Sequence, residues 1–260
     1  MDLPINVKVI EESSIEILPL FDWHLGSHEC DETLVDSIIK YIQETENCYT
    51  FIGGDLGEFC VYDGKMNAVH RQKHQVTEQV EMIIKKLEPI KEKILFSVCG
   101  NHEARIEKST GLDVAALIAL SLNVPYFKWE THFILKLISA KSKKEKKNVY
   151  IYAHHGCGGG ASSGGKINAI ERLHFRAPFA HIIFAGHTHI ASETRELIPY
   201  LSQAGNMKNF VQYFISCGTS HKSDGYAAMK AYRPIPIGAV KTSIRLTPDN
   251  EVRCDTIVFE

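Results

Sequence analysis

The ten residues from Ile94 to Glu103, with the sequence ILFSVCGNHE, join a largely apolar run directly to a cluster of polar side chains. Residues 94–99 have the length and composition of a strand that is buried on both faces. Residues 100–103, Gly-Asn-His-Glu, follow where such a strand must end. Apolar strands that end in chemically active side chains are typical of α/β proteins, which bind ligands at the carboxyl ends of their strands.

Four other apolar runs in the chain end in the same way. They are followed by the motifs Asp22-x-His24 (after 15–21), Gly54-Asp55 (after 48–52), His154-His155-Gly156 (after 149–153) and Gly186-His187-Thr188-His189 (after 181–185). Because the carboxyl ends of strands line one crevice, we expect these clusters to lie close together although the sequence separates them widely.

Segments with helical periodicity lie between these runs. The spacing of apolar residues predicts amphipathic helices over 31–42 and 76–87, and a weaker helical signal covers 166–173. The second half is richer in extended segments, at 131–137, 149–153, 181–185, 211–216, 239–246 and 252–259. We therefore predict an α/β fold. Since neither a linker nor an internal repeat interrupts the sequence, we expect a single domain over residues 1–260.

The composition excludes several classes of protein. The chain has 260 residues, of which 44% are hydrophobic and 23% charged, as in a folded globular protein. Its 29 basic and 31 acidic residues give a net charge of −2, so a polyanion would need a local basic patch. Neither a membrane-spanning run nor a signal peptide is evident, and the seven cysteines are scattered. A cytoplasmic location, no membrane contact and reduced, mostly core thiols are expected.

The five polar clusters together supply two aspartates, one asparagine and four histidines as candidate metal ligands. This mixed oxygen and imidazole set suits Mn, Fe, Zn, Ni or Co better than Ca or Mg. Seven protein ligands are too many for one catalytic ion, which must keep an open coordination position. We expect two divalent transition-metal ions that share a bridging carboxylate, with manganese as the first choice.

The motifs D-x-H, GD, GNHE, a strand-end His-Gly and GHTH occur in this order over residues 21–190. In this order they resemble the motifs of the calcineurin-like metallophosphoesterase superfamily. The resemblance implies a four-layer αββα sandwich, in which helices flank two packed mixed β-sheets. It also implies that a hydroxide bridging two metal ions hydrolyses a phosphoester.

The same resemblance assigns roles to individual residues. One metal ion would be held by Asp22, His24, Asp55 and His189, and the other by Asp55, Asn101, His155 and His187, so that Asp55 bridges. His102 would act as a general acid or as a hydrogen-bond donor to the phosphoryl group, and Glu58 would orient it. Adjacent strand residues point in opposite directions, so one of His154 and His155 faces the metals, and the His-Gly pattern of the family favours His155.

Three further residues are candidates for contact with the substrate. Arg105 either pairs with a phosphate or bonds Glu103, and we favour the structural role. Lys166 follows a Gly/Ser-rich segment that lacks the Ser or Thr of a nucleotide-binding P-loop, so a substrate phosphate fits it better than ATP. His28 is either a substrate contact or a surface histidine.

We predict a phosphodiesterase that acts on a nucleotide or a nucleic acid. The residues after Asp55, LGEFC, lack the arginine of the GD-x-x-D-R-G motif of protein phosphatases, which helps to grip a dianionic monoester. The chain also resembles compact, repair-exonuclease-like phosphoesterases of phages and bacteria. A nuclease would need a basic groove, for which the lysine-rich run 141–147 and Lys166 are candidates.

Two other functions compete with this prediction. One is a phosphomonoesterase that acts on nucleotides or proteins, and the other is a non-catalytic metal-binding interaction module. The sequence leaves open whether the chain forms a homo-oligomer.

Overall fold

The structure, a computed structural model, describes residues 6–9, 12–61, 72–138, 146–160, 162–224 and 233–260. The strands are β1 (Asn6–Val9), β2 (Ser14–Ile17), β3 (Cys48–Ile52), β4 (Ile94–Ser97), β5 (Glu130–Ile138), β6 (Lys146–His154), β7 (Ile182–Ala185), β8 (Ala191–Leu201), β9 (Met207–Thr219), β10 (Gly238–Leu246) and β11 (Val252–Phe259). The α-helices are α1 (Glu32–Glu44), α2 (Val76–Leu87), α3 (Asn101–Thr110), α4 (Val114–Ser121) and α5 (Ser163–Glu171), with 3-10 helices η2 (Glu88–Lys93) and η3 (Arg172–Phe175). Within the described ranges, every helix is too short or too polar to cross a bilayer.

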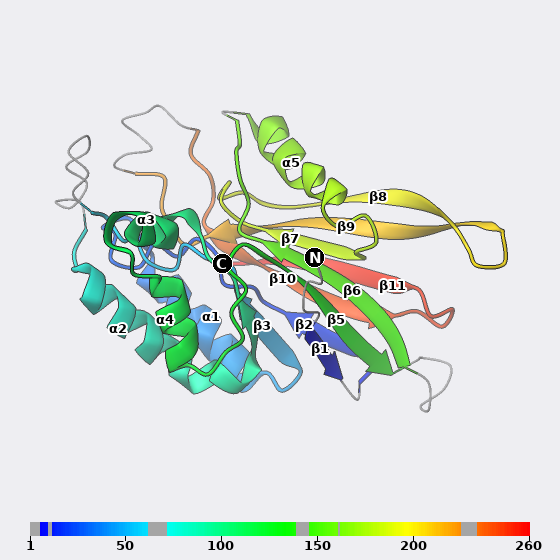
Figure 1. Cartoon of the computed structure of the whole chain (residues 1–260), viewed down its shortest axis with the longest axis horizontal. Helices are drawn as coiled ribbons and strands as arrows, with labels where there is room; N and C mark the ends of the chain where they lie inside the picture. Colours follow the sequence, from blue (N-terminus) through cyan, green and yellow to red (C-terminus); the bar gives the residue numbers. More distant parts are fainter. Residues whose placement is uncertain (1–5, 10–11, 62–71, 139–145, 161, 225–232) are drawn as a thin grey trace.

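The strands form one continuous hydrogen-bonded path that folds back on itself (Figure 1). Its order is β1-β5-β6-β7-β9-β10-β2-β3-β4, with β8 paired to β9 and β11 paired to β10. β9 and β10 meet at Gly218–Ala239 and Thr219–Gly238, and this short joint divides the path into two sheets. β6, β7 and β9 run parallel in one sheet, and β2, β3 and β4 run parallel in the other.

The two sheets face each other across a core that aromatic rings dominate. Phe51 of β3 stacks on Phe96 of β4 with 4.6 Å between ring centroids, and its edge meets Phe184 of β7 at 5.4 Å. Phe96 also lies 5.4 Å from Phe133 of β5. All four side chains are buried, so rings from both sheets fill the space between them and fix how the strand ends align.

Helices cover the outer faces of both sheets. α1 and α4 pack on the β2-β3-β4 sheet through residues such as Leu34, Ile38 and Ile118. On the other sheet, α5 and η3 contribute Ile170 and Leu173 to a separate apolar cluster. The order helix, sheet, sheet, helix confirms the four-layer α/β sandwich that the resemblance implied (Figure 1).

The amphipathic helix expected over 31–42 is present as α1. Asp31 caps it, because its Oδ1 accepts a hydrogen bond from Leu34 N at 3.1 Å, and its apolar stripe is buried. The weaker signal at 166–173 corresponds to α5, which begins earlier because Ser162 Oγ accepts a hydrogen bond from Gly165 N.

Some features differ from the sequence expectations or lie outside them. α3, α4 and β8 were not predicted; β8 carries charged and largely exposed residues at the edge of its sheet, which hides a strand pattern. All seven cysteines are free thiols. Cys157 is exposed, and the other six are buried. Of the lysine-rich run 141–147, residues 141–145 lie outside the described residues.

Candidate metal centre

The structure brings all seven predicted ligands to one edge of the two sheets. Asp22 and His24 follow β2, Asp55 follows β3, Asn101 opens α3 after β4, His155 follows β6, and His187 and His189 follow β7. Strands from both sheets therefore contribute to one site, as the position of the polar clusters in the sequence led us to expect.

The backbone is strained at most of these positions. Five of the seven residues have a positive φ in the left-handed region: Asp22 (51°), His24 (51°), Asp55 (55°), His187 (66°) and His189 (59°). This conformation costs an L-residue about 1 kcal/mol, although Asp, Asn and His tolerate it better than most. Such strain persists where surrounding contacts enforce it, and it gathers at functional sites.

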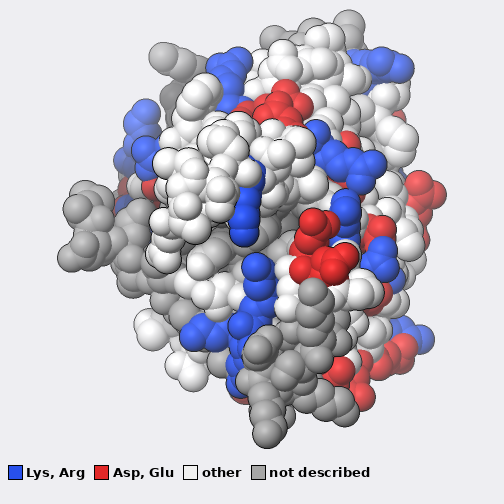
Figure 2. All heavy atoms as spheres, turned by 90° about the vertical axis from the view of Figure 1, so that its right-hand side faces the viewer, with Lys and Arg blue, Asp and Glu red and all other residues white. Residues whose placement is uncertain are grey.

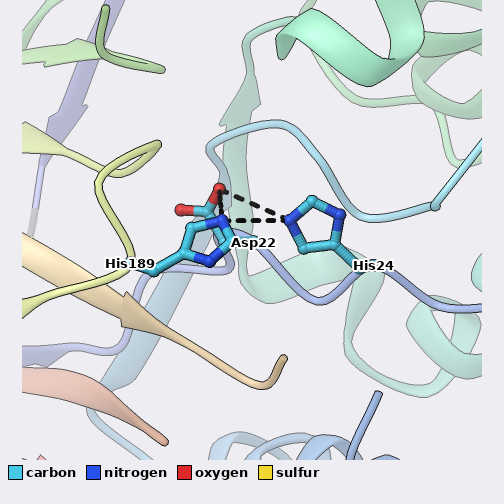
Figure 3. A group of neighbouring side chains, drawn as sticks. All are labelled: Asp22, His24 and His189. Carbon is cyan, nitrogen blue, oxygen red and sulfur yellow. Dashed lines mark hydrogen bonds and ion pairs between the residues drawn. The ribbon is translucent and has the colours of Figure 1, made fainter. Parts of the chain in front are cut away.

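Asp22, His24 and His189 form one group of potential ligands (Figure 3). The Nε2 atoms of the two histidines lie 3.1 Å apart, and Asp22 Oδ1 lies 3.4 Å from the Nε2 of His189 and 3.9 Å from that of His24. Asp22 is completely buried, and its Oδ1 has no hydrogen-bond partner among the described residues. A buried carboxylate oxygen without a donor, facing two imidazole nitrogens, fits a divalent transition-metal ion.

Asp55, His155 and His187 form a second group, which Asn101 joins. His155 Nε2 lies 3.2 Å from Asp55 Oδ2 and 3.1 Å from Asn101 Oδ1. His187 Nδ1 is 2.8 Å from the same Asn101 oxygen. This set of oxygen and nitrogen atoms suits the same class of ion as the first group.

The two groups are connected through the main chain. The main-chain N–H of His187 donates to Asp22 Oδ2 at 2.8 Å, and the N–H of His24 donates to the Asp55 carbonyl at 3.0 Å. The groups are therefore neighbours held in a fixed relation. The Asp55 carboxylate lies within the second group, and its bridging role stays a prediction.

Hydrogen bonds orient the imidazole rings of both groups. His24 Nδ1 donates to Glu58 Oε2 at 3.1 Å, and His155 Nδ1 donates to the Gly53 carbonyl at 2.9 Å, so that each Nε2 faces its group. Burial opposes charge on both rings. The bond to Glu58 nevertheless raises the pKa of His24 to about 9, and the charge of Asp55 raises the pKa of His155 to about 10.

The contacts of Glu58 differ from the expectation that its carboxylate orients His102. The carboxylate is 3.1 Å from His24 Nδ1 but 3.9 Å from His102 Nδ1. His102 Nδ1 instead donates to the main-chain carbonyl of Glu58 at 2.6 Å. Glu58 therefore positions both histidines, His24 through its side chain and His102 through its backbone.

His102 itself lies over the second group. Its main-chain N–H donates to Asp55 Oδ1 at 2.8 Å, and its Nε2 is 3.9 Å from Asp55 Oδ2. Burial lowers the pKa of His102 to about 4. The ring does not join the Asp55, His155 and His187 group, but with His24 and Glu58 it forms a third group of potential ligands. The division between metal ligands and proton donor therefore stays a prediction.

The buried carboxylate of Glu103 holds the loops of the site together. It accepts hydrogen bonds from the main-chain N–H groups of Asp55, Leu56 and Gly100 at 2.9 to 3.0 Å. The expected bond between Arg105 and Glu103 is not formed, because these main-chain groups already occupy the Glu103 carboxylate. The Nη1 atom of Arg105 lies 4.0 Å from Cys60 Sγ. The last residue of the GNHE motif is therefore a structural anchor of the Asp55 loop.

His221 also lies in the site, although it was not among the predicted site residues. Its ring centroid is 4.9 Å from that of His24 and 6.0 Å from that of His189, and its Nε2 is 3.2 Å from Ser27 Oγ. Burial and the neighbouring His24 lower its pKa to about 3. His221 could have been found in the sequence by its position just after a strand, β9, because the other site residues also follow strands.

The remaining candidates lie at different distances from the site. His154 Nδ1 accepts a hydrogen bond from Gly156 N at 2.7 Å, which leaves His155 as the histidine that faces the metal ligands. Lys166 is half-buried in the first turn of α5, and burial lowers its pKa. His28 is exposed. Among the described residues, neither Lys166 nor His28 contacts a predicted ligand.

A model of the calcineurin-like phosphoesterase family matches residues 22–191, from the first ligand motif to just beyond the last. The chain belongs to this family. It is similar to the solved structure of Vps29 from Chaetomium thermophilum, at 10% identity and a TM-score of 0.38, over 94% of this chain and 98% of that chain. It is also similar to wild-type Vps29 from Entamoeba histolytica complexed with Zn²⁺, at 14% identity and a TM-score of 0.29, over 69% and 89%. No curated protein matches the chain.

In this calcineurin-like phosphoesterase, Gly100 leaves no room for a side chain. A Cβ there would lie 2.1 Å from Asp55 Oδ1 and 2.4 Å from Asp55 N. We therefore expect Gly100→Ala to displace Asp55 and to lower the Mn²⁺ retained per chain, measured by elemental analysis after dialysis. Gly164→Ala is the matched control, since a Cβ there meets nothing within 4 Å. Equal metal content in the two variants would contradict the proposed position of the ions.

The adjacent histidines provide a second test. His155→Ala should weaken Mn²⁺ binding by at least about tenfold, because it removes a nitrogen that faces Asp55 and Asn101. His154→Ala should leave Mn²⁺ affinity within about twofold of the parent. Isothermal titration calorimetry measures both. A larger loss in the His154 variant would reverse the assignment.

Proposed function

We propose that this protein is a metal-dependent phosphodiesterase that acts on a nucleotide or a nucleic acid. The observation that carries the proposal is the two neighbouring groups of potential ligands around Asp22 and Asp55, in the first of which Asp22 Oδ1 has no donor among the described residues. Membership of the calcineurin-like phosphoesterase family supports the reaction class.

The two groups would hold two divalent ions, for which manganese is our first choice. Asp22, His24 and His189 would hold one ion, and Asn101, His155 and His187 the other, with Asp55 between them. When bound, the ions supply positive charge that polarises the phosphoryl group and lowers the pKa of coordinated water. The protein contributes a buried, oriented set of donors that holds this charge in place.

His102 is the residue that we assign to the leaving group. Its ring lies beside Asp55 and is fixed by the bond from Nδ1 to the Glu58 carbonyl, so its Nε2 remains available to the substrate. Because Nδ1 already donates to the Glu58 carbonyl, Nε2 carries a proton only when the ring is protonated. In that form His102 can donate a hydrogen bond to a phosphoryl oxygen or a proton to the departing oxygen. Glu58 acts as a positioning residue for this ring.

The charge near His102 favours a diester over a monoester. The hydrogen bond from His24 holds the pKa of Glu58 at about 2 against the effect of burial, so Glu58 is ionised. A phosphodiester carries one negative charge and a monoester up to two, so the part of the Glu58 charge that its partner His24 does not offset disfavours the monoester more. In the protein-phosphatase motif an arginine supplies a compensating cation. Here the neighbouring Leu56 and Phe59 are apolar and buried in the core, so neither position supplies one.

The test compares bis-p-nitrophenyl phosphate with p-nitrophenyl phosphate as substrates of metal-stripped protein resupplied with Mn²⁺. We expect diester turnover that depends on Mn²⁺ and exceeds monoester turnover. Asp55→Asn should reduce both metal content and turnover to background, because Asp55 serves the second group directly. A preference for the monoester would make the protein a phosphomonoesterase. Bound metal without turnover of either substrate would favour a non-catalytic metal-binding module.

A second variant separates metal binding from proton donation. His102→Ala should retain the Mn²⁺ content of the parent but lower kcat for the diester by about 10² to 10⁴, the usual contribution of a general acid. His132→Ala is a suitable control, since His132 lies on β5, which carries none of the predicted ligands, and its ring meets Tyr152 of β6. Metal loss in the His102 variant would show that His102 serves as a ligand.

A further inference from the structure

A second concave surface lies far from the metal centre. It is a groove of about 1270 Å³, bordered by the start of β6, the residue before β7, the outer part of the β8–β9 hairpin and the turn between β10 and β11. His181 precedes β7 and His187 follows it, so about 20 Å of extended chain separates the groove from the metal ligands. Figure 2 looks onto this end of the molecule, where Lys and Arg side chains lie in the middle of the face beside a group of acidic side chains.

The groove contains a row of aromatic rings that the backbone holds in place. The rings of Tyr150 and His181 stack at 5.4 Å with 6° between their planes. Tyr150 N donates to His181 Nδ1 at 3.0 Å, and His181 N donates to the Tyr150 carbonyl at 2.8 Å. Phe210 meets His181 at 5.4 Å, and Tyr200 meets Phe210 at 6.1 Å. Tyr150 and Tyr200 are 41% and 39% exposed, so their rings are accessible to a ligand.

Exposed lysines border these rings. They are Lys146, Lys147 and Lys208. In the part of the chain that the structure describes, none of these three lysines forms an ion pair with a carboxylate. Burial and the charge of Lys147 lower the pKa of His181 to about 4, so the stacked imidazole is neutral near pH 7. On the turn between β10 and β11, Glu251 is paired with Arg253 at 3.2 Å. Asp249 lines the groove as well, so its charged side chains are four basic and two acidic ones: Lys146, Lys147, Lys208, Arg253, Asp249 and Glu251.

We propose that this groove binds single-stranded nucleic acid. Accessible ring faces beside unpaired ammonium groups are the combination that such strands require, because bases stack on the rings and phosphates meet the lysines. A duplex would keep its base faces hidden in its own stack, and an acidic peptide has no flat faces to match the rings. The groove-lining residues include none of the predicted metal ligands, so the proposal does not depend on the proposed hydrolysis.

The test measures the binding of a fluorescein-labelled 20-nucleotide oligothymidylate by anisotropy. It uses the full chain with its metals removed by a chelator, so that the strand is not cleaved. We expect Tyr150→Leu to weaken binding by about tenfold through lost stacking, and Tyr150→Phe, which keeps the ring, to bind like the parent. Thermal unfolding followed by circular dichroism checks that the Leu variant is folded.

The charge of the groove is tested in the same assay. Lys208→Glu should weaken binding and reduce the slope of log K against log salt by about 0.7, as expected for one lost phosphate contact on a single strand. Lys40→Glu, on the far helical layer, is the matched control and should change neither quantity.

Two results would overturn the proposal. One is equal affinity for the oligonucleotide in the parent, Tyr150→Leu and Lys208→Glu proteins. The other is binding of heparin or a DNA duplex as tight as that of the single strand, with no effect of Tyr150→Leu, which would indicate a general polyanion site.

Hydrolysis of bis-p-nitrophenyl phosphate by the same variants with Mn²⁺ distinguishes the groove proposal from the proposed hydrolysis. Turnover without oligonucleotide binding would remove the groove proposal alone, and binding without turnover would remove the proposed hydrolysis alone.

Discussion

Three carboxyl groups, those of Asp22, Asp55 and Glu103, are buried together where the strands of both sheets end. A buried carboxylate is costly unless donors or cations surround it, and the loops of the site are arranged to meet this demand. Three main-chain N–H groups serve Glu103, the N–H of His102 serves Asp55, and the N–H of His187 serves one oxygen of Asp22. The other oxygen of Asp22 has no donor within the described part of the chain, and a cation fits there.

The sequence predicted an α/β fold and the group of candidate ligands because both depend on local patterns, whereas the four-layer arrangement was implied by the family resemblance. The apolar stripe of α1 and the polar residues after each apolar run could be recognised without tertiary information. The partners of Glu58 could not be recognised in this way, since they depend on how the chain turns at Phe59, which has a positive φ of 45°. The carboxylate of Glu58 contacts His24, and its main-chain carbonyl contacts His102. No periodicity in the sequence reports such a turn.

Strand boundaries explain two other differences. β9 continues to Thr219, three residues beyond the predicted 211–216 strand, so His221 was not recognised as a residue at a strand end. β8 lies at the edge of its sheet and carries charged, exposed side chains, so its pattern does not alternate as that of a half-buried strand does. The β8–β9 hairpin forms one side of the aromatic groove. Because the rings of the groove are distant in sequence, only the structure shows that they form a group.

The left-handed backbone at five of the candidate ligands has a consequence for the evolution of the fold. Glycine adopts this conformation with little strain, so replacing such a residue by glycine relieves strain at that position and at the same time removes a ligand. Selection for thermal stability alone would therefore tend to erase the site residue by residue. A chain of this family that lost its need for metal would be free to drift toward glycine at these positions.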